Sequence, residues 1–338
     1  MNNSEKSNAH SLLGRFIQRQ ESSIIIALVL YMAIVSFVNP TFISSANQFN
    51  VMRSAGFTLI TVVGMTFVLI TGGLDLSVGS VLALGGVITG IACRAGLPVP
   101  IAVLMGMLMG LVIGLLNATI IVRAGIPPLI VTLGMQYAAK GLVSVLTKGV
   151  PIYPLPAGFK AIERLRPAGV PMVVIFAVLV AIAGHVILSS TEFGRSIYAL
   201  GGNEEAARIS GIRTKRTKFY VYVLTSMFAA IAGIFMSARL GSAEAAAGSG
   251  YELTVICGAI IGGTSTFGGT GSIIGSVLGA LFMEELTNSL TLMRISVYWQ
   301  NLVVGTILIL AVVLDQYKRN LIMRQAIRSI GKGEENAA

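Results

Sequence analysis

The sequence is short of charged residues. Asp, Glu, Lys and Arg make up 11% of its 338 residues, whereas soluble domains carry about 25%. Hydrophobic residues make up 54%, and the mean hydropathy is +0.83. This composition excludes an ordinary soluble domain and indicates that most of the chain lies in lipid. The 39 Gly residues agree with this, because small residues let membrane helices approach closely.

Residues that bind metals or form disulfides are also scarce. The chain has two Cys and two His, and two isolated cysteines form neither a disulfide framework nor a metal cluster. No Ser, His and Asp set falls at a common depth, and no pair of acids flanks a possible base. We therefore expect no enzyme activity, no metal and no cofactor.

A nucleotide-binding loop is missing as well. The Gly-rich run 262–271 has the composition of a phosphate-binding loop but lacks the ending Gly-Lys-Ser/Thr, which occurs nowhere in the chain. If ATP drives this protein, another polypeptide binds it. The Gly run instead predicts a tight turn and close helix packing. The net charge of +10 is not gathered in a dense basic patch with interleaved aromatic residues, so we expect no nucleic acid partner.

Long apolar stretches fill most of the chain. Because about 20 apolar residues cross a bilayer as a helix, they predict an all-α membrane protein, a polytopic bundle of about ten transmembrane segments. One of them is short and Gly-rich, so it is expected to be incomplete or re-entrant. A Pro-rich loop is expected at 148–170. The expected spans are 22–38, 50–71, 77–93, 99–122, 127–146, 171–189, 219–238, 252–263 (the short one), 271–288 and 297–314.

Positive charge predicts the orientation of these spans. Most of the 24 Lys and Arg residues fall in an N-terminal segment (1–21), a polar loop (190–218) and a C-terminal tail (315–338). Cytoplasmic segments carry the excess of positive charge. We therefore expect both termini and the loop to be cytoplasmic, around a membrane domain at 22–314.

The loop contains the longest polar run of the chain, residues 192–218. A short amphipathic helix is predicted within it, because Asn203 can cap a helix, Glu204 and Glu205 suit its positive end, and Gly211 can end it. A short helix held between two spans is typical of a docking element. We expect a protein outside the membrane to push on it.

Three motifs in this order resemble the permeases of bacterial ABC importers of the ribose type. They are Gly-Arg-Ser-Ile-Tyr-Ala-Leu-Gly-Gly-Asn-Glu-Glu-Ala-Ala-Arg-Ile-Ser-Gly-Ile at 194–212, Gly-Gly-Leu-Asp-Leu-Ser-Val-Gly-Ser at 72–80, and Gly-Tyr-Glu-Leu at 250–253 with Gly-Gly-Thr-Ser at 262–265. The resemblance covers about residues 20–317. The first motif resembles the family's cytoplasmic coupling loop, and the matching residues are Gly194, Arg195, Tyr198, Gly201, Gly202, Asn203, Glu204, Ala206, Ala207, Ser210 and Gly211.

The resemblance implies a transport subunit of the bacterial inner membrane. It implies two permease copies, as a homodimer or a heterodimer with a paralogue, and an ATPase subunit with two nucleotide-binding modules. A periplasmic sugar-binding protein would deliver a monosaccharide, with ribose as the default. Other pentoses, hexoses and autoinducer-2 stay open, and branched-chain amino acid permeases are the nearest alternative in the family.

Polar residues within or beside the spans are candidates for the translocation path or its gate. The candidates are Asp75, Ser77, Asn117, Gln136 and Asn288. Asp75 stands at a Gly-rich break between two spans, where it is either a switch or simply a cap that binds free backbone amides. For the uncharged groups, hydrogen bonds between helices are an equally good interpretation.

A different class of transporter remains as an alternative. An ion-driven secondary transporter needs ion-binding acids or histidines in its spans, and the candidates are His185, Glu284 and Glu285. At least one of the two glutamates is expected to face a polar cavity or a partner helix. An internal echo, 72–82 against 268–278, is either a repeat or a chance match between Gly-rich helix starts.

Overall fold

The computed structural model describes residues 20–335, and most of them are helical. Most of the expected N-terminal segment 1–21 therefore lies outside the described residues. The main helices are α2 (Gln20–Val38), α3 (Ser45–Ile70), α4 (Val78–Arg94), α5 (Val99–Arg123), α6 (Pro128–Thr147), α7 (Ala157–Arg164), α8 (Met172–Ser190), α9 (Glu192–Gly202), α10 (Glu204–Ile209), α11 (Thr214–Leu240), α12 (Tyr251–Ile261), α13 (Ile273–Leu292) and α14 (Val297–Glu335). Short 3-10 turns are η1 (Pro40–Ile43), η2 (Pro167–Gly169) and η3 (Ala245–Gly248).

Proline and glycine set several of these helix ends. Pro98, Pro127 and Pro171 each stand directly before a helix, at the starts of α5, α6 and α8. Proline suits a helix start because its fixed φ is helical and its missing N–H has no partner to lose there. Gly241 ends α11 in the left-handed conformation, at φ 67°.

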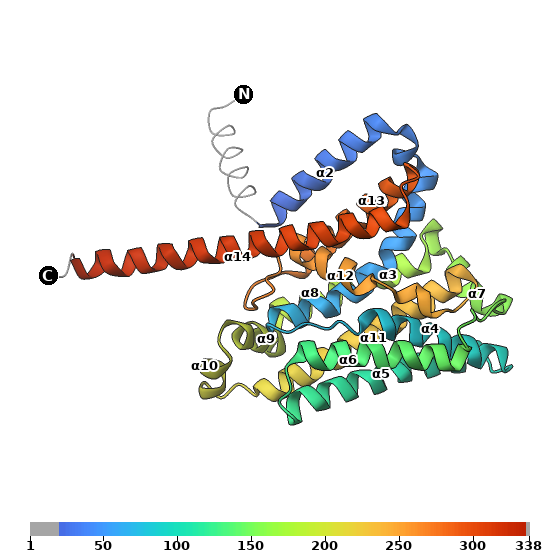
Figure 1. Ribbon diagram of the computed structural model, residues 1–338, viewed down its shortest axis with the longest axis horizontal. Helices are drawn as coiled ribbons and strands as arrows, with labels where there is room; N and C mark the ends of the chain where they lie inside the picture. Colours follow the sequence, from blue (N-terminus) through green and yellow to red (C-terminus); the bar gives the residue numbers. More distant parts are fainter. Residues whose placement is uncertain (1–19, 336–338) are drawn as a thin grey trace.

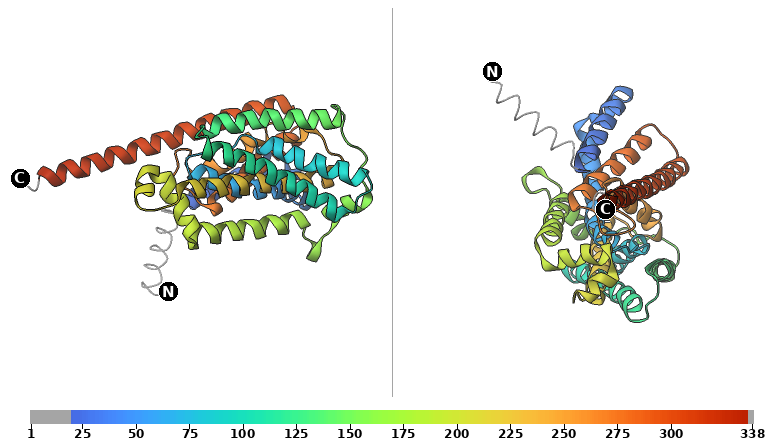
Figure 2. Two further views of the ribbon diagram at one scale, coloured as in Figure 1. Left: turned by 90° about the horizontal axis from the view of Figure 1, so that it is seen from below. Right: turned by 90° about the vertical axis from the view of Figure 1, so that its left-hand side faces the viewer.

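The long helices run along the same axis and form one bundle (Figure 1). Most residues of α3 and α11 are buried, which places these two helices at the centre. At one end lie α9 and α10, and at the other lies α7; we call these the α9 end and the α7 end. The outer helix α14 continues past the α9 end (Figure 2), and its apolar part Val297–Tyr317 has no buried residue.

Six of the described helices are long and apolar enough to cross a membrane: α3, α5, α6, α8, α11 and the Val297–Tyr317 part of α14. Each of the ten expected spans contains a helix, but α2 and α4 offer shorter apolar stretches and α12 has only 11 residues. At 1.5 Å per residue α12 is about 16 Å long, too short to cross. It follows a non-helical stretch, 241–250, apart from the turn η3.

Glycines allow the central helices to touch. A Cβ on Gly233 of α11 would overlap the carbonyl group of Leu82 in α4. A Cβ on Gly262 would likewise overlap the carbonyl of Gly275 at the start of α13. At such positions a glycine lets the backbones of two neighbouring helices approach closely.

Three regions differ from the sequence-based expectations. The expected loop 148–170 contains α7, whose buried Glu163 forms an ion pair with Arg53 of α3. Helix α14 does not end with the last expected span at residue 314 but continues unbroken to Glu335. The polar loop contains a second helix, α9, which has few charges and packs against α8 and α3. The sequence analysis missed α7 and α9 because contacts with distant helices stabilise them, and a local sequence pattern does not reveal such contacts.

Candidate functional site

The polar loop folds into two capped helices. Thr191 caps α9 by accepting a hydrogen bond from the Gly194 amide at 3.1 Å. Asn203 caps α10 by accepting one from the Ala206 amide at 3.0 Å, as the sequence predicted. Gly211, at φ 84°, lets the chain turn from α10 toward α11. The loop is therefore a defined structural element at the α9 end.

Helix α9 packs against two non-helical segments of the bundle, the chain after the end of α3 and the Gly-rich loop 262–271. The backbone of Gly201 lies against the carbonyl of Ile70, where α3 ends, and against the amide of Gly269. Gly269 donates a hydrogen bond of 2.8 Å to that same carbonyl of Ile70. The hydroxyl of Tyr198 donates to the carbonyl of Gly271 at 2.7 Å. Helix α9 therefore contacts both the end of α3 and the Gly-rich loop 262–271.

This contact unites the motifs that the sequence analysis found separately. The two copies of the internal echo meet there, since Gly268 lies against the amide of Gly72. Gly201, from the polar loop, also lies against Gly268 and Gly269. The sequence named these motifs, but only the fold brings them to one place.

Helix α10 presents an exposed side to the surroundings. Ile209 is 78% exposed, a high value for an isoleucine, and Ala206 is also exposed. Ala207 is buried inside the chain, so only one of the two adjacent alanines faces outward. Arg208 pairs with Glu205, and this hydrogen bond raises the pKa of Arg208 above its usual value. Lys218 of α11 holds Glu204 at 2.7 Å, which ties α10 to the bundle.

The other predicted members of the loop set have varied surroundings. Gly194 is buried and lies against the carbonyls of Ile187 and Leu188, which makes the turn from α8 to α9 tight. Arg195, Gly202 and Ser210 are exposed at the same end of the molecule. The loop set is therefore divided between residues that fix α9 and residues that face outward.

Three of the predicted polar candidates do gather. One carboxylate oxygen of Asp75, Oδ1, accepts hydrogen bonds from the Ser77 amide at 2.9 Å and from the Ser77 hydroxyl at 2.6 Å. Asn117 of α5 donates to the same hydroxyl at 3.0 Å. The other carboxylate oxygen, Asn117 Oδ1 and the hydroxyl of Tyr222 are buried and have no hydrogen-bond partner within residues 20–335. Tyr222, which the sequence analysis missed, lies against Gly73 beside this cluster.

The remaining two candidates lie elsewhere. Gln136 of α6 donates to the carboxylate of the buried Glu252 at 2.8 Å, at the start of α12. Asn288 of α13 exchanges hydrogen bonds of 2.9 and 3.1 Å with Asn47 of α3. The five candidates thus occupy three separate places, and Asn288 is engaged in a contact between helices.

A cavity of about 700 Å³ lies between α3, α11, α12, α13 and α14, close to the end of α11. We call it the polar cavity because hydroxyl, amide and charged groups stand among its apolar lining. Glu284 lines it and accepts a hydrogen bond from Thr58 at 2.5 Å. Glu285 points elsewhere, toward Gln48, and His185 is exposed on α8. The expectation that one glutamate faces a polar cavity is therefore confirmed. Arg239, Tyr251 and Thr58, which also line the cavity, were missed because they belong to distant helices.

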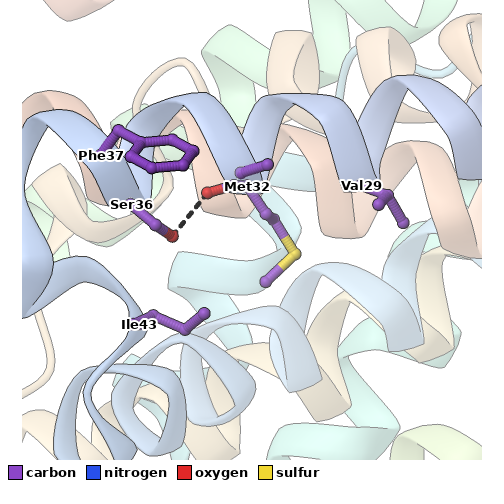
Figure 3. A pocket seen from close by; sticks show the side chains of 6 residues that line it. Val29, Met32, Ser36, Phe37 and Ile43 are labelled. Carbon is purple, nitrogen blue, oxygen red and sulfur yellow. Dashed lines mark hydrogen bonds between the residues drawn. The ribbon is translucent and has the colours of Figure 1, made fainter.

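A second hollow of about 400 Å³ differs in chemistry (Figure 3). It lies between α2 and η1 and is lined by Val29, Met32, Ala33, Ser36, Phe37 and Ile43. The Ser36 hydroxyl is already bound to the carbonyl of Met32 at 2.6 Å. Its apolar lining suits lipid chains and offers a polar solute nothing to bind. Within the part of the chain that the structure describes, no three His, Cys, Asp or Glu residues are placed to hold a metal.

Comparison with known proteins places this architecture in a family. Residues 47–312 match the model for the permease component of the branched-chain amino acid transport system. The ribose import permease protein of Bacillus subtilis (strain 168) is 40% identical over 295 residues, 87% of this chain and 92% of that protein. The corresponding protein of Escherichia coli (strain K12) is 39% identical over 306 residues, 88% of this chain and 94% of the other.

A further relative has a different stated sugar. The D-allose transport system permease protein of Escherichia coli (strain K12) is 35% identical over 291 residues, 86% of this chain and 89% of that protein. No solved structure matches the chain. Long matches at this identity leave the family in no doubt, and the apolar helices agree with an inner-membrane protein. The chain therefore belongs to the family of ABC-importer permease components whose model is named for branched-chain amino acid transport.

Proposed function

We propose that this chain carries a monosaccharide across the inner membrane as the permease subunit of an ABC importer. The three relatives described above are named for ribose or D-allose, and a further one, 33% identical, for xylose. The chain covers 89% or more of each. Pentoses and hexoses are therefore the substrate class, with ribose the first sugar to test.

The single observation that carries the mechanism is the insertion of α9 between the end of α3 and the Gly-rich loop. Gly201 touches the Ile70 carbonyl, and Tyr198 holds the Gly271 carbonyl. An ATPase that displaces α10 displaces α9 with it, because one residue, Asn203, separates the two helices. The displacement then reaches α3, at the centre of the bundle.

The family implies three partners: an ATPase subunit, a second permease copy and a periplasmic binding protein. A separate ATPase with two nucleotide-binding modules docks on α10 of two permease copies, and a periplasmic binding protein supplies sugar at the opposite face. With about ten membrane crossings, the α9 end and both termini are proposed to be cytoplasmic, on the basis of the positive charges of the sequence. The α7 end, with the polar cavity, then faces the periplasm.

Ile209 is the residue that tests docking. An apolar side chain that is 78% exposed on a short polar helix is suited to a groove of a partner protein. Ile209→Glu should abolish copurification of the ATPase and sugar uptake, while the permease inserts normally. Leu165→Glu is the matched control, because Leu165 is 52% exposed directly after α7, at the opposite end of the bundle. Full uptake and copurification by the Ile209→Glu importer would contradict α10 as the docking element.

A further inference from the structure

The polar cavity is the feature of the molecule that none of the relatives' names explains. Its volume of about 700 Å³ lies within the 300–1,000 Å³ usual for small-molecule sites. Its floor is the start of α12, where Ser249, Gly250 and Tyr251 line it. The Tyr251 hydroxyl lies 3.0 Å from the hydroxyl of Thr61, past the midpoint of α3. The cavity therefore reaches the middle of the bundle from the α7 end.

A broken helix is what lets the cavity end at this depth. The chain leaves α11 at Gly241 and returns inward through residues 242–250, where Gly248 lies against the backbone of Gly79 in α4. Helix α12 then starts inside the bundle and not at its surface. Non-helical backbone at membrane depth is tolerated where it lines a polar cavity, and such half-helices surround solute sites in transporters.

The two charges of the cavity lie on different walls. Arg239 donates to Ser54 at 2.7 Å and lies over the ring of Phe57, 5.7 Å from its centre. Glu284 accepts from Thr58, and within the described residues it forms no ion pair with Arg239. The lining has equal numbers of acidic and basic groups, so its net charge is zero. An anion would face Glu284 and a cation would face Arg239.

The remaining polar lining is neutral. Hydroxyl and amide groups come from four helices and from the stretch before α12, and they are Ser54, Thr58, Ser249, Tyr251, Thr254, Thr287, Gln300 and Asn301. A sugar hydroxyl both donates and accepts, so one can donate to Glu284 while another accepts from Arg239. The rings of Phe57 and Tyr251 offer flat apolar surface to the C–H face of a sugar.

We propose that this cavity binds the transported monosaccharide on its way through the permease, with Glu284 and Arg239 holding its hydroxyl groups and Tyr251 forming the floor. The proposal rests on the proposed function and adds the site. Affinity is low, with half-occupancy at about 1–10 mM, because the cavity is open and its contacts are hydrogen bonds exchanged with water. A neutral polyhydroxylated solute is preferred over a zwitterionic amino acid.

Binding is tested without transport by labelling a cysteine in the cavity wall. Asn301 is exposed and lines the cavity, whereas Ser296 is exposed outside it. Both native cysteines are buried, so background labelling is low. In the full importer, ribose, xylose or allose at about 10 mM should slow maleimide labelling of Asn301→Cys but not of Ser296→Cys. Protection by leucine in place of the sugars, or no protection by any of them, overturns the proposal.

Transport by neighbouring glutamate variants provides the second test. Glu284→Gln removes the charge in the cavity, while Glu285→Gln makes the same change at a buried residue that contacts Gln48 outside it. We expect Glu284→Gln to reduce ribose uptake about tenfold, the usual loss for a hydrogen bond to a charged group, and to keep ATPase stimulation by loaded binding protein. Glu285→Gln should keep both. Equal uptake by the two variants overturns the site.

The two tests separate failure of the site from failure of the proposed function. If the unaltered importer takes up sugar but neither protection nor the Glu284→Gln effect is found, only the site is wrong. If the unaltered importer takes up none of the sugars, the proposed function is wrong. Protection of Asn301→Cys by sugar would still support the site in that case.

Discussion

The hydroxyl of Tyr198 donates a 2.7 Å hydrogen bond to the carbonyl oxygen of Gly271. This bond joins α9 to the Gly-rich loop across 73 residues of sequence. Beside it, Gly201 lies against the Ile70 carbonyl, so α9 contacts both breaks in the bundle. Through these contacts α9 joins α10 to the end of the central helix α3 and to the Gly-rich loop.

Removing the Tyr198 hydroxyl should weaken coupling. Tyr198→Phe loses one neutral hydrogen bond, worth about 0.5–1.5 kcal/mol. We expect ATPase stimulation by loaded binding protein to fall about two- to tenfold, with insertion and ATPase binding unchanged. Tyr220→Phe is the control, because Tyr220 is exposed on α11 and contacts Phe193 through its ring. Equal stimulation in both variants would show that the Tyr198 bond carries no force.

Two adjacent glycines give a sharper comparison. A Cβ on Gly201 would overlap the Ile70 carbonyl, whereas a Cβ on Gly202 meets nothing within 4 Å. Gly201→Ala should therefore separate α9 from α3 and lower the free energy of unfolding by about 1–3 kcal/mol. Gly202→Ala should change it little. Thermal unfolding of the purified permeases measures the difference, and similar midpoints for the two variants would contradict the packing described here.

Helix α14 is fastened to the same Gly-rich loop. Asp315 accepts hydrogen bonds from the Ser265 hydroxyl at 2.9 Å and from the amide and hydroxyl of Thr266 at 3.1 and 3.2 Å. Arg319, one turn further, lies 4.8 Å from the ring centre of Phe267. Asp315→Ala should reduce transport, because without the carboxylate α14 no longer holds the loop. One hydrogen bond to a charged group contributes about 1.5–3 kcal/mol to the free energy of unfolding.

A double variant shows whether Asp315 acts through Ser265. Each single variant, Asp315→Ala and Ser265→Ala, breaks the same bond, so the losses in unfolding free energy should not add when combined. Chemical denaturation of the three variants measures this. Fully additive losses would mean that the two residues act independently.

Orientation can be tested at the two ends of the bundle. Arg164 is exposed in α7, and Lys215 is exposed at the start of α11 beside α10. A membrane-impermeant maleimide added to intact cells should label Arg164→Cys and leave Lys215→Cys unlabelled. Both native cysteines are buried and should give little background. Labelling of Lys215→Cys from outside would reverse the orientation.

The sequence by itself determined the class of protein, most helix positions and the helix cap at Asn203. Apolar run length and cap chemistry are local properties, so they can be read without the fold. It also named Asp75, Ser77 and Asn117, which the fold joins in one cluster.

Only the tertiary structure decided which distant groups meet. The contact of Gly201 with Ile70, the buried position of Ala207, and the pairing of Asn288 with Asn47 depend on helix rotation and depth. The cavity lined by Thr58, Arg239, Tyr251 and Glu284 brings together side chains from four helices. Periodicity does not determine these placements, because packing of whole helices against one another sets which face of each helix turns inward.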